Sequence, residues 1–455
     1  MSDYRRIAVL DIGKTNAKVV VLDSTTGAEI AVRKQPNTVI RDGLYPHYDI
    51  EALWSFALAS LKAFASEPGF DAISITTHGA AAALLGADGK LVMPVIDYEH
   101  EYPQEIRDAY DALRPPFSET FSPRLSMGLN IGAQLHYQKT AFAEEFAKVA
   151  TILTYAQYWS ARLTGVAANE ATSLGCHTDL WNPKTGAYSS LVDALAIRDR
   201  MAPIHSAFDP LGPVLPDIAE EIGLSVPVYC GIHDSNASLL PHLVGREAPF
   251  TVVSTGTWVI NFGVGGDLAH LDAKRDALAN VDAYGRAVPS SRFMGGREFE
   301  ILSAEIGKVG DAEAKAAIAD VVERGIMLLP NVAPGSGPFP GKVSRWINVE
   351  DANRDERYTA ACLYLALMTE ACLGLIGAKG PIIVEGPFAL NETYLSLIAA
   401  ITGRDTMALP GSTGTSQGAA LLAGIKPVSG VEKHFSPQAI PGLPAYRERW
   451  YAAME

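Results

Sequence analysis

The sequence contains few of the residues that disulfide scaffolds and thiolate metal centres require. Its 455 residues include only four cysteines, Cys176, Cys230, Cys362 and Cys372, and no two of them form a Cys-x-x-Cys pair. Four dispersed cysteines in a chain of this length argue against a disulfide-stapled secreted scaffold, a zinc ribbon and a thioredoxin-type centre.

Basic residues are also scarce relative to acidic ones. The chain has 37 Lys and Arg against 51 Asp and Glu, a formal net charge of -14. Such a chain is poorly suited to bind the phosphate backbone of a nucleic acid or an anionic membrane surface. We therefore expect neither nucleic acid nor membrane as a partner.

Long uncharged apolar runs are absent as well. The most apolar long stretch, residues 360–378, carries Thr369 and Glu370 at its middle, which predicts a buried helix and not a membrane span. The first residues, Met-Ser-Asp-Tyr-Arg-Arg, lead straight into a strand-like segment without the apolar region of a signal peptide. We expect a cytoplasmic location.

The residues that are present predict a globular α/β protein. Hydrophobic residues make up 48% of the chain and charged residues 19%, enough to build a core, and the length suggests two large domains. Residues 7–10 and 18–22 read as two strands joined by a polar turn, residues 50–65 have helical apolar spacing, and residues 71–76 form a buried strand. This alternation of strands and helices is typical of α/β folds.

The strand–turn–strand pattern recurs about 240 residues later. Residues 250–253 and 258–262 are strand-like and flank the turn Ser254-Thr255-Gly256-Thr257. Further strands at 381–384 and 406–409 complete a second α/β region. The recurrence predicts a duplicated protein with domains at 1–243 and 244–455.

The first turn carries residue types that bind nucleotide phosphates: Asp11, Gly13, Lys14, Thr15, Asn16 and Lys18. Gly13 allows close backbone approach, Thr15 and Asn16 offer hydrogen bonds, and either Lys14 or Lys18 supplies positive charge. Asp11 is suited to hold magnesium through water. An ordinary polar hairpin turn explains the same residues equally well.

Other polar residues follow predicted strands. Asp234 comes after a strand at 226–230, where a carboxylate can accept a substrate hydroxyl proton, although capping of a helix near Asn236 is an alternative. His78 and Gly79 follow the strand at 71–76 and are suited either to bind a sugar hydroxyl or to form a turn. His233 taken alone reads as structural. Asp97-Tyr98-Glu99 is suited either to accept hydrogen bonds from sugar hydroxyls or to form a solvated loop.

Taken in order, these motifs resemble the FGGY carbohydrate kinases. The resemblance rests on Asp11-Ile-Gly-Lys-Thr-Asn, Thr77-His-Gly, Gly231-Ile-His-Asp234, Ser254-Thr-Gly-Thr-Trp258, Gly386 and Gly414-Thr-Ser-Gln-Gly418. It covers about residues 5–425. The wider fold group includes actin, hexokinase and the Hsp70 ATPase domain.

The resemblance implies two ribonuclease-H-like lobes with a nucleotide and sugar cleft between them, and ATP and Mg²⁺ as cofactors. The implied base is Asp234 and the implied metal residue Asp11. The implied ATP contacts are Gly13, Lys14, Thr15, Asn16, Lys18, Gly256, Thr257 and Gly386. The implied sugar contacts are His78, Gly79, His233, Ser235, Asp97 and Glu99.

Within the family, His233-Asp234-Ser235 and Gly256-Thr257-Trp258 look most like the L-rhamnulose and L-fuculose kinases. This implies phosphorylation of a ketose at O1, with kinases of ribulose, xylulose or erythritol and a non-catalytic ATP- and sugar-dependent sensor as alternatives. Two departures stand out. Glu385-Gly386-Pro387 replaces the usual run of glycines, and Lys14 stands where a small residue is common. A homodimer is left open.

Overall fold

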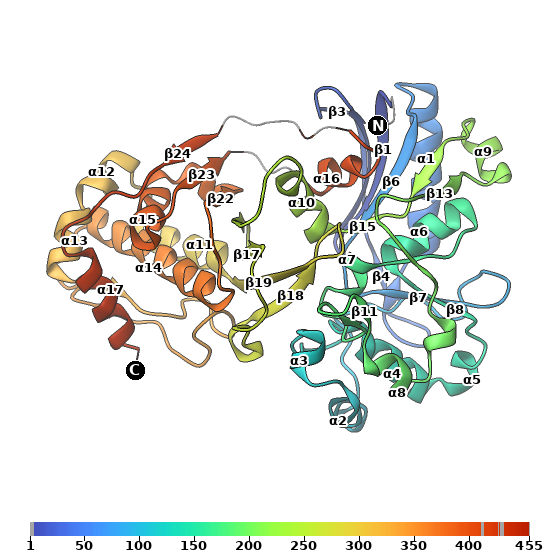
Figure 1. Cartoon of the computed structure of the whole chain (residues 1–455), viewed down its shortest axis with the longest axis horizontal. Coiled ribbons are helices and arrows are strands. Elements are labelled where there is room, and N and C mark those ends of the chain that lie inside the picture. Colours follow the sequence, from blue (N-terminus) through green and yellow to red (C-terminus); the bar gives the residue numbers. More distant parts are fainter. Residues whose placement is uncertain (1–3, 411–413, 426, 428–431, 455) are drawn as a thin grey trace. The chain divides into compact units, whose positions relative to one another are not determined.

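The computed structural model describes residues 4–410, 414–425, 427 and 432–454. The chain divides into two compact units, whose parts are coloured along the sequence in Figure 1. Unit 1 comprises Met1–Gly245, Ala279–Ala287 and Thr413–Val428, and unit 2 comprises Arg246–Leu278, Val288–Ser412 and Ser429–Glu455. The units are thus not continuous in sequence, and the division into domains 1–243 and 244–455 stays a prediction.

Unit 1 is built on a mixed seven-stranded sheet. Its strands are β1 (Arg6–Ile12), β2 (Asn16–Asp23), β3 (Glu29–Pro36), β6 (Ala72–Thr77), β13 (Pro210–Pro213), β14 (Pro227–Tyr229) and β15 (Ile232–His233). The order is β13-β14-β6-β1-β2-β3, and β15 also pairs with β6. β1 is antiparallel to β2 and parallel to β6, so the predicted first hairpin is confirmed.

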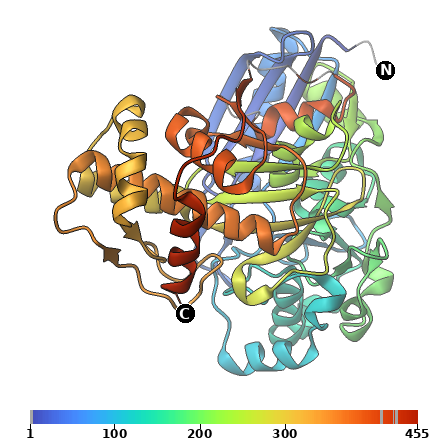
Figure 2. The same cartoon turned by 60° about the vertical axis from the view of Figure 1, so that its left-hand side comes forward.

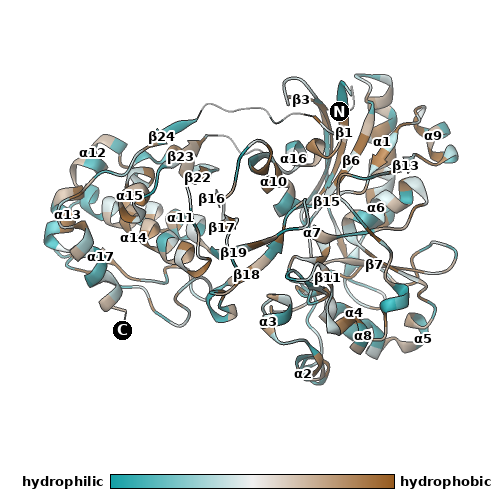
Figure 3. Ribbon diagram, viewed as in Figure 1, coloured by the Kyte–Doolittle hydropathy of each residue, from teal (hydrophilic) through white to brown (hydrophobic). Residues whose placement is uncertain are grey.

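Helices cover this sheet because its central strands are apolar on both faces. β6 is buried along its whole length, as expected for a strand enclosed between helices. Figure 3 shows hydrophobic colour along the strands around β1 and β6. α16 packs on β1 and β6, α6 on β6, and α1 on β2. The helices of unit 1 are α1 (Ile50–Ser66), α2 (Gln104–Leu113), α3 (Phe117–Thr120), α4 (Ile131–Ala141), α5 (Ala143–Phe146), α6 (Tyr155–Thr164), α7 (Ala171–Leu174), α8 (Ser190–Ala194), α9 (Pro216–Ile222), α10 (Asp234–Leu243) and α16 (Thr415–Leu421).

Local sequence explains the first of these helices. Asp49 precedes α1 and accepts a hydrogen bond from the Ala52 N–H at 3.0 Å, which caps the helix. Leu53, Leu61 and Phe64 recur at helical spacing and are buried. The predicted helix at 50–65 is therefore confirmed.

Unit 2 repeats the sheet order of unit 1. Its main strands are β16 (Phe250–Thr255), β17 (Val259–Val264), β19 (Ala287–Phe293), β22 (Ile382–Glu385), β23 (Thr406–Leu409) and β24 (Lys433–Phe435). They lie in the order β19-β17-β16-β22-β23-β24. β16 is antiparallel to β17 and parallel to β22, as β1 is to β2 and β6. Both units thus have the ribonuclease-H-like arrangement, and the predicted α/β duplication is confirmed.

A long buried helix lies at the core of unit 2. This helix is α14 (Arg354–Leu375), orange in Figure 2, which packs against β17 and α15 (Glu392–Thr402). Asn353 and Glu356 form a capping box at its start. Among the described residues it is the one helix long and apolar enough to cross a membrane, but 78% of its most apolar window is buried in the protein. This agrees with the predicted buried helix. The remaining helices of unit 2 are α11 (Gly295–Ile306), α12 (Asp311–Ala316), α13 (Ile318–Arg324) and α17 (Leu443–Ala452).

Candidate active site

Asp234 stands where a strand of the unit 1 sheet passes into a helix. β15 pairs with β6 and ends at His233, and Asp234 is the first residue of α10. Its Oδ1 accepts a hydrogen bond from the Ser235 N–H at 2.6 Å and lies 3.2 Å from His233 Nε2. Asp234 thus accepts from one N–H group at the start of α10, as the capping alternative expected. It does so as the first residue of the helix, because the N-cap residue is His233.

The environment of Asp234 changes its acidity. Burial raises the pKa of its carboxyl from 3.8 to about 6, and the neighbouring Asp11 adds to this, whereas His78 and the Ser235 N–H oppose it. About 30% of the side chain is exposed, so the carboxylate can be reached. A carboxylate with a pKa near 6 is ionised at neutral pH yet basic enough to accept a proton.

Two buried imidazoles lie beside this carboxylate. Burial lowers the pKa of both His78 and His233 to about 4, so both rings are neutral at pH 7. His78 Nδ1 bonds to the Gly79 carbonyl at 2.7 Å, whereas its buried Nε2 has no hydrogen-bond partner within the described chain. A buried polar atom without a partner is costly unless a ligand satisfies it.

Gly79 is required for this arrangement. A Cβ atom at this position would lie 2.7 Å from His233 Nε2, closer than side chains normally approach. The His233 ring therefore packs directly on the backbone of residue 79. The structure brings together the predicted residues His78, Gly79, His233, Asp234 and Ser235.

Asp11 is held by hydroxyl groups that the sequence reasoning gave no role. Asp11 lies near the end of β1, and its Oδ2 accepts from Thr415 Oγ1 at 2.6 Å and from Ser416 Oγ at 2.7 Å, both in the first turn of α16. Lys18 Nζ is 3.9 Å from the same oxygen. The hydrogen bonds of the described residues leave Asp11 Oδ1 unused, so it can accept from a magnesium-bound water.

The turn after Asp11 is tight and open to solvent. The Gly13 N–H donates to the Asn16 carbonyl at 2.9 Å, and Asn37 Nδ2 donates to the Gly13 carbonyl at 2.9 Å. Thr15 and Asn16 are exposed, and their side chains bond to each other at 3.1 Å. Their polar atoms are thus available to an anionic oxygen. The Lys14 ammonium is instead paired with Asp97.

The second predicted turn lies in unit 2 beside the predicted adenosine glycine. Gly256 and Thr257 are exposed between β16 and β17. The Thr255 hydroxyl donates to the Glu385 carbonyl and accepts from the Phe388 N–H at 3.0 Å. Gly386 has φ +79°, and a Cβ there would lie 2.0 Å from the Thr255 carbonyl oxygen. The segment that carries Gly386 therefore lies directly against Thr255, the residue before Gly256 and Thr257.

Over residues 4–410, 414–425, 427 and 432–454, no group of three or more His, Cys, Asp or Glu side chains is placed to hold an ion. Mg²⁺ keeps several waters and is commonly held by one or two carboxylates together with substrate phosphates. The donor set at Asp11 is suited to that role.

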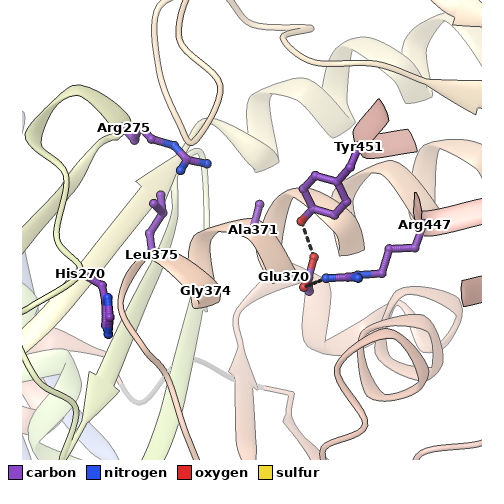
Figure 4. Close-up of a pocket in the computed structure, with 8 residues that line it drawn as sticks. All are labelled: His270, Arg275, Glu370, Ala371, Gly374, Leu375, Arg447 and Tyr451. Atoms are coloured by element: carbon purple, nitrogen blue, oxygen red, sulfur yellow. Dashed lines mark hydrogen bonds and ion pairs between the residues drawn. The ribbon is translucent and has the colours of Figure 1, made fainter. Parts of the chain in front are cut away.

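A pocket in unit 2 lies apart from the predicted residues. It has a volume of about 370 Å³ and is drawn in Figure 4. Its lining residues are His270, Arg275, Glu370, Ala371, Gly374, Leu375, Arg447 and Tyr451. Glu370 accepts from Arg447 at 2.7 Å and from the Tyr451 hydroxyl. Its carboxylate is thus already partnered, and we assign the pocket no role in the reaction.

Curated relatives are distant and match only part of the chain. The L-fuculokinase of Salmonella typhi is 25% identical over 263 residues, 56% of this chain and 55% of that protein. The L-fuculokinase of Escherichia coli K12 is 23% identical over 270 residues, again 55% of its length. The chain thus spans about half the length of the curated relatives it matches.

Solved structures match along the whole chain. A carbohydrate kinase from Novosphingobium aromaticivorans is 38% identical, with a TM-score of 0.90 over 98% of this chain and 100% of that one. Xylulose kinase from Rhodospirillum rubrum is 19% identical, with a TM-score of 0.81 over 99% and 97% of the two chains, and supports the fold alone.

Two family descriptions match in succession. Residues 6–241 match the N-terminal domain of the FGGY family of carbohydrate kinases. Residues 247–432 match the carbohydrate kinase FGGY C-terminal domain. The two matches cover most of the chain, so this protein belongs to the FGGY family of carbohydrate kinases.

Proposed function

We propose that the protein transfers the γ-phosphoryl group of ATP to O1 of a ketose, with a 6-deoxyketohexose such as L-rhamnulose or L-fuculose as the first candidate. The observation that carries the proposal is Asp234, an accessible carboxylate with a pKa raised to about 6. The similarity to L-fuculokinases supports the choice of sugar. The protein is expected to act in the cytoplasm on a small sugar, without nucleic-acid or membrane partners.

Asp234 acts as the general base in this proposal. It accepts the proton of the attacking hydroxyl while a bond forms between that oxygen and the γ-phosphorus and the bond to the leaving ADP oxygen breaks. His78 Nε2 and the Ser235 hydroxyl orient the sugar, and His233 supports the turn that carries Asp234. Phosphoryl transfer requires little covalent chemistry from the protein, so positioning and electrostatic stabilisation provide most of the rate acceleration.

The remaining predicted residues bind the nucleotide. Mg²⁺ with ATP neutralises charge on the phosphates, and Asp11 would hold the ion through water. Backbone N–H groups and short polar side chains suit phosphate oxygens. The proposed ATP contacts are Gly13, Thr15, Asn16 and Lys18 in unit 1 and Gly256, Thr257 and Gly386 in unit 2.

We expect kcat/KM to fall about tenfold per pH unit below pH 6, because protonated Asp234 cannot accept a proton. This fall is the acidic limb of the pH profile. His78 and His233 do not produce it, since the pKa of each is lowered to about 4. Buried Glu170, whose pKa is raised to about 7, is the competing group. Steady-state rates from pH 4.5 to 9 check the prediction.

Glu170→Gln is the control for that profile. Glu170 caps α7 and bonds to Thr172, whose hydroxyl accepts from the His233 N–H. The variant should keep the limb near pH 6. Loss of the limb in this variant would assign it to Glu170 and contradict the role of Asp234.

A coupled ADP-release assay with Mg-ATP against ketoses, aldoses and polyols tests the proposed reaction. Turnover on L-rhamnulose or L-fuculose supports the reaction and the sugar. Turnover on ribulose, xylulose or erythritol keeps the kinase and replaces the sugar. ATP and sugar binding without turnover on any compound would favour the sensor alternative.

A further inference from the structure

Lys14 lies in the first turn but contacts Asp97 and Glu99, two of the predicted sugar contacts. Its Nζ is ion-paired with Asp97 and lies 3.5 Å from a Glu99 carboxylate oxygen. The same ammonium lies over the ring of Tyr48, 5.1 Å from the centroid, and over that of Tyr98, 4.8 Å away. Only 17% of the side chain is exposed.

These contacts leave Lys14 poorly placed to serve as a phosphate ligand. An ammonium has three N–H donors, and here two carboxylates and two aromatic faces stabilise its charge. Withdrawing Lys14 would leave Asp97, whose side chain is 3% exposed, as a buried unpaired carboxylate, which is strongly unfavourable. Lys18 is the alternative phosphate-binding cation, since it lies 3.9 Å from Asp11 and pairs with the more exposed Glu29.

Lys14 fixes one oxygen of Asp97 and leaves the other available. Asp97 Oδ1 accepts from Lys14, from the Tyr48 hydroxyl at 3.3 Å and from the Glu99 N–H at 3.2 Å. The hydrogen bonds of the described residues leave Oδ2 unused. A carboxylate held in one orientation with a spare acceptor is suited to bind a hydroxyl.

His78, whose Nε2 has no hydrogen-bond partner among the described residues, packs beside the same two tyrosines. The His78 ring lies 5.1 Å from that of Tyr48 and 5.7 Å from that of Tyr98, between centroids. Its Nε2 is buried without a partner in the part of the chain that the structure describes. His78 and Lys14 also interact electrostatically, as do His78 and Asp234. Two unused polar atoms, Asp97 Oδ2 and His78 Nε2, thus belong to one packed group near the base.

We propose that Lys14 is a positioning residue for the sugar and not a ligand of ATP. This inference rests on the proposed kinase function. Lys14 holds Asp97 so that its free oxygen, together with His78 Nε2, binds hydroxyls of the acceptor other than the one that is phosphorylated. Lys14 pairs with Asp97 and Glu99, and the Asp234 carboxylate interacts with His78 and Tyr98 of the same group. The group thus holds three carboxylates and one ammonium, so the site takes a neutral polyhydroxy compound and rejects aldonates and sugar phosphates.

Separate titrations of sugar and ATP test this role. Lys14→Met should raise the KM for the sugar by about tenfold or more, as expected when a buried polar contact is lost, and change the KM for ATP by less than about twofold. Lys14→Arg, which keeps the charge, should recover part of the loss. Lys18→Met is the matched comparison. It should raise the KM for ATP and leave the KM for the sugar almost unchanged.

A double-mutant cycle with Asp97 tests whether Lys14 acts through that residue. Lys14→Met/Asp97→Asn should be no worse for sugar KM than Lys14→Met alone, because both changes remove the same contact. Thermal melting confirms that each variant folds, and Asp97→Asn alone carries the test if Lys14→Met does not fold.

The outcomes separate this inference from the proposed function. A higher ATP KM with unchanged sugar KM would place Lys14 on the phosphates and overturn the inference alone. Effects of Lys14→Met and Asp97→Asn on the sugar KM that simply multiply in the double variant would also overturn the inference. Turnover of an aldonate as efficient as that of a neutral sugar would do the same. A wild-type protein that neither turns over nor binds any sugar of the panel by calorimetry would overturn the proposed function and this inference with it.

Discussion

Asp234→Asn is expected to lower kcat by about 10²- to 10⁴-fold, the range typical for loss of a general base. The amide keeps the shape of the carboxylate but cannot accept the hydroxyl proton at neutral pH. Asp234 is not among the proposed ATP contacts, so the dissociation constant for ATP should change little. Coupled ADP release measures the first quantity and calorimetry the second.

The same substitution should make the protein more stable at alkaline pH. The pKa of Asp234 is raised from 3.8 to about 6 on folding, so the folded state binds its proton more tightly than the unfolded state. The resulting stabilisation is fully present below pH 4 and is lost as pH rises through 6. Removing the charge should therefore stabilise the variant at pH 8 by about 1–3 kcal/mol, with partial solvent exposure favouring the lower value.

An exposed carboxylate provides the control for that effect. Asp193 pairs with Arg198, which lowers the pKa of Asp193, and Asp193→Asn makes the same change of charge. It should not stabilise the protein at pH 8 and should leave kcat unchanged. Wild-type turnover in Asp234→Asn would contradict the role of Asp234, and loss of ATP binding along with turnover would indicate a structural role.

Gly386→Ala should destabilise unit 2 and weaken ATP binding. The new Cβ would lie 2.0 Å from the Thr255 carbonyl oxygen and 2.9 Å from its hydroxyl, at φ +79°. Relief of the clash requires β16 and the segment after β22 to move apart, next to Gly256 and Thr257. We expect a loss of about 3 kcal/mol or more in unfolding free energy, because strain and steric overlap act together. Urea unfolding and ATP calorimetry measure the two effects.

Gly403→Ala is a matched control for the backbone strain. Gly403 ends α15 with φ +66°, and a Cβ there meets no heavy atom within 4 Å. This variant should cost about 1 kcal/mol from the left-handed conformation alone and leave ATP binding intact. Equal losses in the two variants would show that the contact with Thr255 does not matter.

Local sequence was sufficient to predict the two hairpins and to single out Asp234, the proposed base. β-Branched runs flank short polar turns before β2 and β17, and this pattern fixes a hairpin without long-range information. Asp234 could be singled out because a strand was predicted shortly before it, at 226–230. The structure has β14 there and adds the short strand β15, which ends directly before Asp234. These features depend on residues that are adjacent in the sequence, so a single sequence is enough to recognise them.

The partners of the site residues could not be predicted in the same way. Thr415 and Ser416 bind Asp11 across more than 400 positions, and Lys14 binds Asp97 across 83. Such pairs depend on how α16 and the segment near residue 97 pack in unit 1. A glycine followed by two hydroxyl residues at a helix start was the available signal for Thr415 and Ser416, and the composition of the turn suggested phosphate for Lys14.

The measurement that tests the central claim most directly is identification of the product by mass spectrometry. Wild type and Asp234→Asn would be incubated with Mg-ATP and L-rhamnulose, L-fuculose or another neutral sugar of the panel. We predict that wild type forms a sugar phosphate in the same amount as ADP, and that Asp234→Asn forms almost none. ADP accompanied only by inorganic phosphate, or equal sugar phosphate from the two proteins, would contradict the account.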